Sequence, residues 1–219
     1  MTFSILAREP ESGAIGGAAA TGNLCVGGWV LRGDIRAGMT ASQGMAPSPF
    51  WGADTLAAMR GGARADEAVR RIVEADSGAA ARQLAALDTG GGTGVHDGAE
   101  NHAWCGHLAA PGLIVAGNWL HSAEVLKAVA DAFAAKQGPL AVRLLAALSA
   151  GAEAGGDARG LMSAALQVHA PEAAPLDLRI DHSDAPLAAL STLHARTLAP
   201  DYRAWLAIVP TLKEPERCR

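Results

Sequence analysis

The chain begins Met1-Thr2-Phe3-Ser4-Ile5-Leu6-Ala7-Arg8. Apolar residues recur through this segment in an alternating pattern, which predicts a β-strand at the start of the chain. If Met1 is removed, Thr2 carries a hydroxyl nucleophile and a free amine, and the amine can accept the hydroxyl proton without help from histidine or aspartate. Many proteins begin Met-Thr without using the threonine in catalysis, so the remaining sequence has to decide between these interpretations.

Short strands and tight turns follow this first strand. Residues 9–13, Glu-Pro-Glu-Ser-Gly, have the composition of a turn, and residues 14–20 predict a partner strand that completes an N-terminal hairpin. Residues 24–31 and 36–42 predict two more strands, with Arg32-Gly33-Asp34 as the turn between them. Glycine and alanine dominate this region, which indicates close approach of the backbone to another packed layer or to a ligand.

Beyond residue 50, blocks of helices alternate with blocks of strands. Helical spacing covers residues 52–60, 65–75, 123–135, 140–152, 186–196 and 202–208. Strand patterns cover residues 83–88, 94–97, 113–117, 161–169 and 176–181. Strands grouped in blocks predict an α+β fold with sheets in the middle and helices outside. We expect one domain over residues 1–210 and a loose tail over residues 211–219.

The composition argues against several classes of partner. The 219 residues are 50% hydrophobic, and 18 Lys and Arg against 22 Asp and Glu give a net charge of -4. Because no long run of one sign occurs, we expect neither nucleic acid nor a membrane surface as a partner. No stretch is apolar for long enough to span a bilayer, and no basic segment precedes an apolar run, so we expect a cytoplasmic protein.

The cysteines and histidines predict neither disulfides nor a metal site. Cys25, Cys105 and Cys218 are odd in number and widely spaced. Cys25 could act as a nucleophile, although a small buried core residue is the better interpretation. His102, Cys105 and His107 fall within six residues but lack a fourth ligand and match no zinc spacing. We therefore expect no metal and no cofactor.

A glycine-rich turn between a predicted helix and a predicted strand is a candidate functional segment. It reads Gly155-Gly156-Asp157-Ala158-Arg159-Gly160 and leads to Ser163. Beside a nucleophile, Asp157 could orient an amine and Arg159 could bind a substrate carboxylate. A structural turn with a surface ion pair explains the same residues equally well.

Polar residues at predicted strand ends add further candidates. Ser42-Gln43 ends one strand and Asn118 follows another, and amide or hydroxyl groups there can donate hydrogen bonds to an oxyanion. Such residues more often simply close a strand into a loop. Arg179 and Asp181 end the last predicted strand, where a salt-bridged strand terminus is the default interpretation and a binding site is the alternative.

Taken together, these segments resemble those of a known family. The chain is similar to a family of bacterial and archaeal proteins, classed only as a domain of unknown function, at the following segments: residues 1–8, Ala41-Ser42-Gln43, Gly117-Asn118, residues 154–160 with Ser163-Ala164-Ala165-Leu166, and Leu178-Arg179-Ile180-Asp181. The resemblance covers about residues 1–196. Two positions differ, since Trp119 stands where methionine is common, and Asp181 is followed by His182-Ser183-Asp184 instead of further acids and a His-Pro pair.

That family resembles the N-terminal nucleophile (Ntn) hydrolases, which have a four-layer α-β-β-α sandwich of two mainly antiparallel sheets and hydrolyse amide bonds. The resemblance implies that Thr2 is both nucleophile and base, in a cleft between the sheets. We assign further catalytic roles to Asp157 and Asn118. The residues assigned to substrate binding are Ser42, Gln43, Arg159, Ser163, Arg179 and Asp181.

The sequence leaves two functions open. The first is an Ntn-type hydrolase that cleaves a small amide, lactam or peptide-like bond in a small-molecule substrate. The sequence is also compatible with a homo-oligomer. The alternative is a catalytically inactive ligand-binding or assembly protein on the same fold. An ordinary α-amine has a pKa of about 7.7 to 8.0, so the hydrolase needs surroundings that favour the neutral amine. It also needs the loss of Met1, because a retained Met1 converts the Thr2 amine into an amide.

Overall fold

The computed structural model describes residues 2–101, 104–156 and 160–218. The strands are β1 Thr2–Arg8, β2 Ile15–Thr21, β3 Leu31–Asp34, β4 Gly38–Gly44, β5 Arg82–Asp88, β6 Thr93–Asp97, β7 Trp104–Ala110, β8 Leu113–Leu120, β9 Ser163–Ala170 and β10 Ala173–Ile180. The helices are α1 Val26–Trp29, α2 Trp51–Arg60, α3 Ala65–Glu74, the short 3-10 helix η1 Ala79–Ala81, α4 Glu124–Ala135, α5 Leu140–Glu153, α6 Pro186–Thr197 and α7 Pro200–Leu206.

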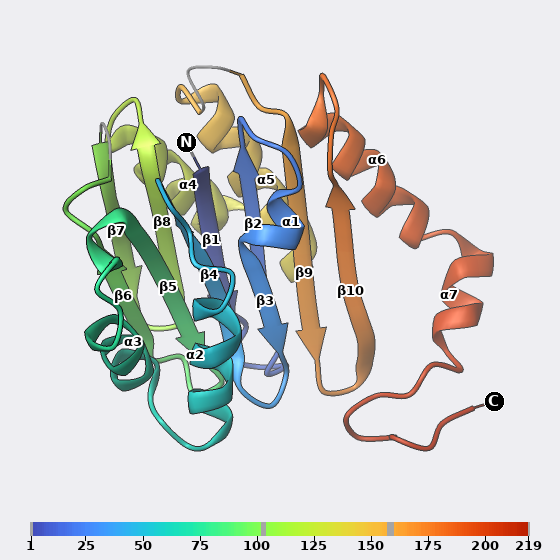
Figure 1. Cartoon of the computed structure of the whole chain (residues 1–219). Helices are drawn as coiled ribbons and strands as arrows, with labels where there is room; N and C mark the ends of the chain where they lie inside the picture. The colour runs from blue at the N-terminus through green and yellow to red at the C-terminus, as the bar shows by residue number, and fades with distance from the viewer. Residues whose placement is uncertain (1, 102–103, 157–159, 219) are drawn as a thin grey trace.

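The strands form two antiparallel sheets that pack face to face. The larger sheet has the order β10-β9-β2-β1-β8-β7, and the smaller has the order β3-β4-β5-β6. Helices α4, α5 and α6 cover the outer face of the larger sheet, and α2 and α3 cover the outer face of the smaller one (Figure 1). The predicted α+β class and the four-layer order of helices, sheet, sheet and helices are confirmed.

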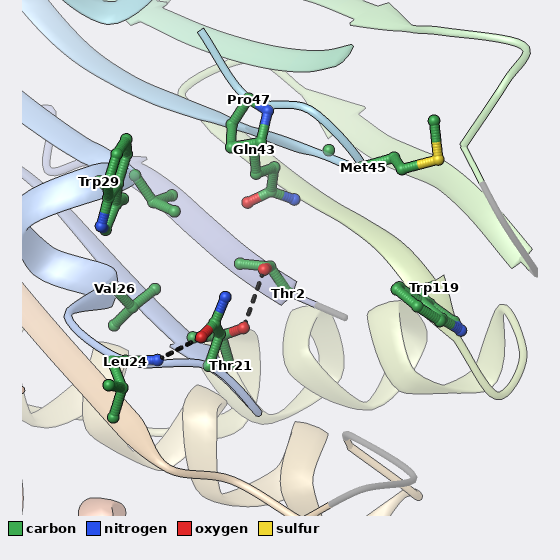
Figure 2. Close-up of a pocket in the computed structure, with 12 residues that line it drawn as sticks. Thr2, Thr21, Leu24, Val26, Trp29, Gln43, Met45, Pro47 and Trp119 are labelled. Atoms are coloured by element: carbon green, nitrogen blue, oxygen red, sulfur yellow. Dashed lines mark hydrogen bonds between the residues drawn. The ribbon is translucent and has the colours of Figure 1, made fainter. Parts of the chain in front are cut away.

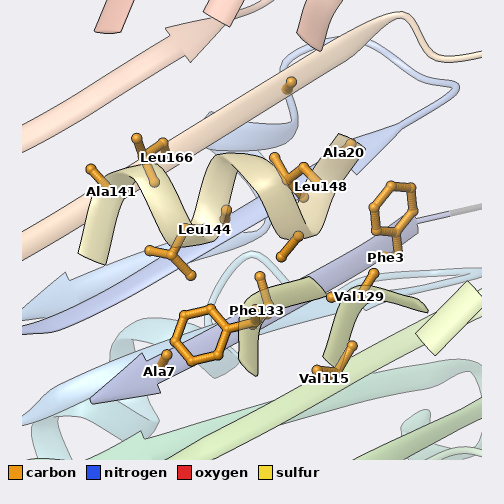
Figure 3. Close-up of a cluster of buried hydrophobic side chains, with 14 of the residues drawn as sticks. Phe3, Ala7, Ala20, Val115, Val129, Phe133, Ala141, Leu144, Leu148 and Leu166 are labelled. Carbon is orange, nitrogen blue, oxygen red and sulfur yellow. The ribbon is translucent and has the colours of Figure 1, made fainter. Parts of the chain in front are cut away.

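Alternation along β1 decides which side chains face which layer. Phe3, Ile5 and Ala7 are fully buried against α4 and α5, in the cluster shown in Figure 3. Leu6 instead belongs to the cluster between the two sheets. Because successive side chains of a strand point to opposite faces, Thr2 shares the face of Leu6 and points toward the smaller sheet.

Small residues allow the two sheets to come close together. A Cβ added to Gly17 on β2 would lie 2.8 Å from Cδ2 of Leu6 and 3.0 Å from the terminal methyl of Met39 on the opposite sheet. A larger residue would therefore force the sheets apart in a closely packed interior. This confirms that the glycines and alanines of the first strands mark close approach to another packed layer.

The segment after β2 differs from its prediction. Residues 24–31 do not form a strand, because Val26–Trp29 is one helical turn, α1, and β3 starts only at Leu31. The Arg32-Gly33-Asp34 tripeptide lies within β3 instead of forming the turn. A short apolar run is compatible with either a strand or a buried helical turn, so periodicity could not separate the two. Helix α1 packs on β9 and β10, beside the smaller sheet.

Two strands of the larger sheet also differ from their predictions. Strand β7 was not predicted. Its second half, residues 107–110, is exposed at the edge of the sheet, so the strand lacks the alternation of a half-buried strand. Strand β8 continues to Leu120, which places Asn118 inside the strand and not after its end. Within the described ranges, no helix is long and apolar enough to cross a membrane.

Candidate functional site

Thr2 starts β1 and lies in a row of polar residues across the larger sheet. Its register partners are Thr21 on β2 and Asn118 on β8, and Thr21 in turn pairs with Ser163 on β9. Directly opposed residues of neighbouring strands share one face of the sheet. The row Ser163, Thr21, Thr2 and Asn118 therefore faces the smaller sheet at one end of the inter-sheet layer.

A cavity of about 380 Å³ opens at this end of the two sheets. It is lined by Thr2, Thr21, Asn23, Leu24, Val26, Trp29, Val30, Gln43, Gly44, Met45, Pro47 and Trp119 (Figure 2). The walls come from β1, β2, the segment around α1, the end of β4 and the end of β8. None of these described lining side chains carries a charge, so the cavity suits a neutral ligand.

The hydroxyl of Thr2 lies inside this cavity. Thr2 is partly buried, and its Oγ1 donates a hydrogen bond to Oγ1 of Thr21 over 3.1 Å (Figure 2). Because the hydroxyl of a threonine can rotate, either group can act as donor in this pair. The pair holds the Thr2 side chain toward the cavity.

Gln43 reaches the cavity from the opposite sheet. Its side chain is 1% exposed and points from β4 toward Thr2 (Figure 2). The Nε2 group of Gln43 donates to Oε1 of Gln83 over 2.7 Å, and Nε2 of Gln83 lies 2.6 Å from Oδ1 of Asp97. Oε1 of Gln43 has no hydrogen-bond partner among the described residues.

Asn118 brings an unpaired donor to the other side of Thr2. Its side chain is 4% exposed, and Nδ2 has no partner within the described part of the chain. The same holds for Oγ of Ser4, the next residue on this face of β1. A buried polar group without a partner costs about 1–3 kcal/mol, and Gln43, which lines the cavity, is therefore placed to gain from a ligand that pairs with it.

The mouth of the cavity is apolar and contains strained backbone. Trp29 is 54% exposed and Trp119 is 45% exposed, and Leu24 and Met45 are exposed beside them. Among the described residues, two non-glycine residues have positive φ: Cys25 at 60° and Trp119 at 56°. Both adjoin the cavity, and strained non-glycine backbone concentrates at functional sites. No local sequence pattern predicts this rim, because its members come from separate loops.

Two of the residues assigned to substrate binding do not line the cavity. Ser42 lies on the opposite face of β4, and its Oγ donates to the carbonyl oxygen of Ser48 over 3.1 Å. Oγ of Ser163 donates to the carbonyl oxygen of Asn23 over 2.7 Å and accepts from the amide of Val26 over 3.1 Å. Ser163 thus holds the loop that forms one cavity wall, without lining the cavity itself.

Arg179 and Asp181 form a surface ion pair beneath α1. Nη2 of Arg179 lies 3.0 Å from Oδ1 of Asp181, and both side chains are substantially exposed. A Cβ added to Gly27 would lie 2.7 Å from Cγ of Arg179, so α1 rests directly on the arginine. Neither residue lines the cavity. Asp157 and Arg159, the other two assigned residues, lie outside the described residues.

The histidines and cysteine of the considered metal cluster have other surroundings. Nδ1 of His107 lies 2.6 Å from Oδ2 of Asp97. Burial, with a smaller contribution from the charge of Asp97, raises the pKa of the Cys105 thiol to about 12, so this thiol stays protonated at neutral pH. No group of three or more His, Cys, Asp and Glu within the described ranges could hold a metal ion, and His102 lies outside those ranges.

The comparisons with known proteins agree on one family. Residues 2–190 match the model of a family of unknown function, DUF1028. The solved crystal structure of protein SPO2555 from Silicibacter pomeroyi, also described as DUF1028, is 49% identical, covers 99% of this chain and 95% of its own, and superposes with a TM-score of 0.95. The search of curated proteins found no match. On the family match and this structural likeness, the chain belongs to the DUF1028 family.

Proposed function

We propose that this protein is an Ntn-type hydrolase that cleaves a small amide, lactam or peptide-like bond with Thr2 after removal of Met1. The observation that carries the proposal is the position of Thr2 at the first residue of a strand in the middle of the larger sheet, with its hydroxyl in an inter-sheet cavity. Loss of Met1 would put a free amine and that hydroxyl on the same residue, beside the same cavity.

In the first half of the reaction, the neutral Thr2 amine accepts the proton of Oγ1, and Oγ1 attacks the substrate carbonyl carbon. The carbonyl π electrons move to its oxygen, and Nδ2 of Asn118 is the unpaired donor that would stabilise the resulting oxyanion. The C–N bond then breaks, the ammonium of Thr2 returns its proton to the departing nitrogen, and an ester on Oγ1 remains.

In the second half, the Thr2 amine accepts a proton from water, and the hydroxide oxygen attacks the ester carbonyl. The tetrahedral intermediate expels Oγ1, which regains a proton, and the carboxylic acid product leaves. The uncharged lining of the cavity supports this use of the amine, because an apolar environment disfavours an ammonium relative to a neutral amine.

Intact mass spectrometry and active-site labelling test the proposal. The natively expressed protein should have lost Met1, and a β-lactone electrophile should acylate Thr2 as a single adduct. Thr2→Ala should abolish the adduct, whereas Thr89→Ala, which removes an exposed threonine in the β5–β6 turn, should leave it intact. Full retention of Met1, or unchanged labelling of the Thr2→Ala protein, would overturn the proposal.

A ligand-binding protein without catalysis is the second candidate. It requires no ionisable side chain, and the described residues that line the cavity include none. If this second candidate is right, neutral apolar ligands bind in the cavity, but the β-lactone does not label Thr2. Binding in the absence of labelling therefore separates the two functions.

A further inference from the structure

We infer that Gln43 is the specificity-determining residue that selects ligands with an amide N–H, and that a relay of side chains fixes its amide in the orientation this requires. The inference concerns the cavity of the proposed hydrolase and rests on that function only for the fate of the ligand, since recognition itself is a matter of binding. Gln83 lies behind Gln43 on the neighbouring strand.

Three acceptors surround Nε2 of Gln83. They are Oδ1 of Asp97 at 2.6 Å, the carbonyl oxygen of Gly117 at 3.0 Å and the carbonyl oxygen of Gly106 at 3.1 Å. A carboxylate and two backbone carbonyls can accept hydrogen bonds but cannot donate them. Rotating the amide of Gln83 by half a turn would place its oxygen against three oxygens, so its NH₂ group has to face them.

This orientation of Gln83 determines the orientation of Gln43. Oε1 of Gln83 is turned toward Gln43, and only the NH₂ group of Gln43 can donate to it, over 2.7 Å. Oε1 of Gln43 is consequently the group left without a partner among the described residues, and Gln43 points into the cavity toward Thr2 (Figure 2). The smaller sheet thus presents an acceptor to the ligand.

The larger sheet presents the complementary group. Asn118 is the register partner of Thr2 and precedes Trp119 of the cavity lining, without being a lining residue itself, and its Nδ2 is a buried donor without a described partner. An acceptor on one side and a donor on the other match the oppositely directed N–H and C=O of a trans secondary amide or a urea. An ester places an oxygen against Oε1 of Gln43, where two acceptors face each other and the buried oxygen stays unsatisfied.

The rim adds a second requirement. Trp29 and Trp119 present large, partly exposed rings at the cavity mouth, and the described lining holds no charge. The preferred ligand is therefore a neutral secondary amide with an apolar or aromatic substituent.

The test compares a matched amide and ester in a protein that cannot turn either over. N-benzylbenzamide and benzyl benzoate differ mainly by an N–H in place of an oxygen, and both are titrated into the Thr2→Ala protein by calorimetry. The amide should bind at least about tenfold more tightly, since a polar site rejects a ligand that leaves its buried group unpaired. Gln43→Met, which keeps the length of the side chain, should reduce this ratio to near one by weakening only the amide.

Matched variants separate recognition from structural damage. Gln167→Met removes another buried glutamine whose Oε1 also lacks a described partner, but far from the cavity, and should keep the ratio. Gln83→Leu releases the amide of Gln43 and should also lower the ratio, whereas His107→Gln, at the distant end of the relay, should not. Equal affinities for amide and ester, no binding of either, or equal losses for both in Gln43→Met would overturn the inference. Because Thr2 is absent here, these outcomes are independent of whether Thr2 is a nucleophile.

Discussion

Thr2 and Thr21 lie opposite each other on neighbouring strands, with their hydroxyl oxygens 3.1 Å apart. This contact joins the proposed nucleophile to its neighbour in the polar row. The contact forms because both side chains point away from the core that faces the helices. The same alternation that buries Phe3 against α4 and α5 therefore delivers Thr2 to the cavity.

The first prediction concerns this pair. Thr21→Val keeps the β-branched shape but removes the hydroxyl that orients Thr2, so the rate of Thr2 acylation by the β-lactone should fall about tenfold, which corresponds to about 1.4 kcal/mol. Time-resolved intact mass gives the rate. The free energy of unfolding, measured by thermal denaturation, should change by less than about 1 kcal/mol, because valine has nearly the same shape as threonine and is equally suited to a strand. An unchanged acylation rate would show that Thr21 has no part in positioning Thr2.

The second prediction concerns the strained backbone at Trp119. A non-glycine residue at φ 56° costs about 1–2 kcal/mol, and glycine does not incur this cost. Trp119→Gly should therefore be about 1 kcal/mol more stable than Trp119→Ala in urea denaturation. Both variants should bind the aromatic amide more weakly than the Trp119 protein, since both lose the ring. Equal stability of the glycine and alanine variants would contradict the account of strain.

Local patterns predicted most of the fold. The helices expected at residues 52–60, 65–75 and 140–152 were confirmed to within one residue at each end, because their apolar stripes bury one face. The turn of α1 and the edge strand β7 were missed. Helix α1 depends on Gly27 and Gly28 resting on Arg179, a contact between segments about 150 residues apart that local spacing cannot encode.

The site was predictable only in part. Thr2, Gln43 and Asn118 were recognisable as polar residues at or near strand ends, and the fold brings Gln43 and Asn118 to Thr2. The relay through Gln83 and Asp97 was not recognisable, because it depends on the register of β4, β5 and β6 and on how closely the sheets pack. The tryptophan rim depends on loop conformation in the same way.

The third prediction concerns the core under the site. Leu144 of α5 is fully buried in the cluster against β1 and β2 (Figure 3), whereas its neighbour Leu145 is only partly buried. Leu144→Ala should lower the free energy of unfolding by about 3 kcal/mol, because it removes buried apolar surface and leaves a cavity. Leu145→Ala should lower the free energy of unfolding clearly less than Leu144→Ala does. Similar losses at both positions in urea denaturation would contradict the assigned burial.

The last prediction concerns stability at mildly acidic pH. Burial lowers the pKa of His169 below its ordinary value of 6.5, and the charge of nearby Asp177 only partly opposes this shift. Above about pH 6.5 the histidine is neutral in both folded and unfolded chains, so its contribution to stability is fully present. As the pH falls below that value, the unfolded chain binds the proton more readily than the folded one, and stability is lost. Urea denaturation should therefore give a smaller free energy of unfolding at pH 5.5 than at pH 7.5.

Substitutions identify the histidine responsible. His169→Gln should reduce the pH-dependent loss, since glutamine cannot take up the proton, whereas His182→Gln at an exposed position should leave it unchanged. Burial also lowers the pKa of His194 on α6, so part of the loss should persist in His169→Gln and shrink further when His194→Gln is added. If the loss between pH 7.5 and pH 5.5 is the same in His169→Gln as in the unsubstituted protein, protonation of His169 does not destabilise the fold.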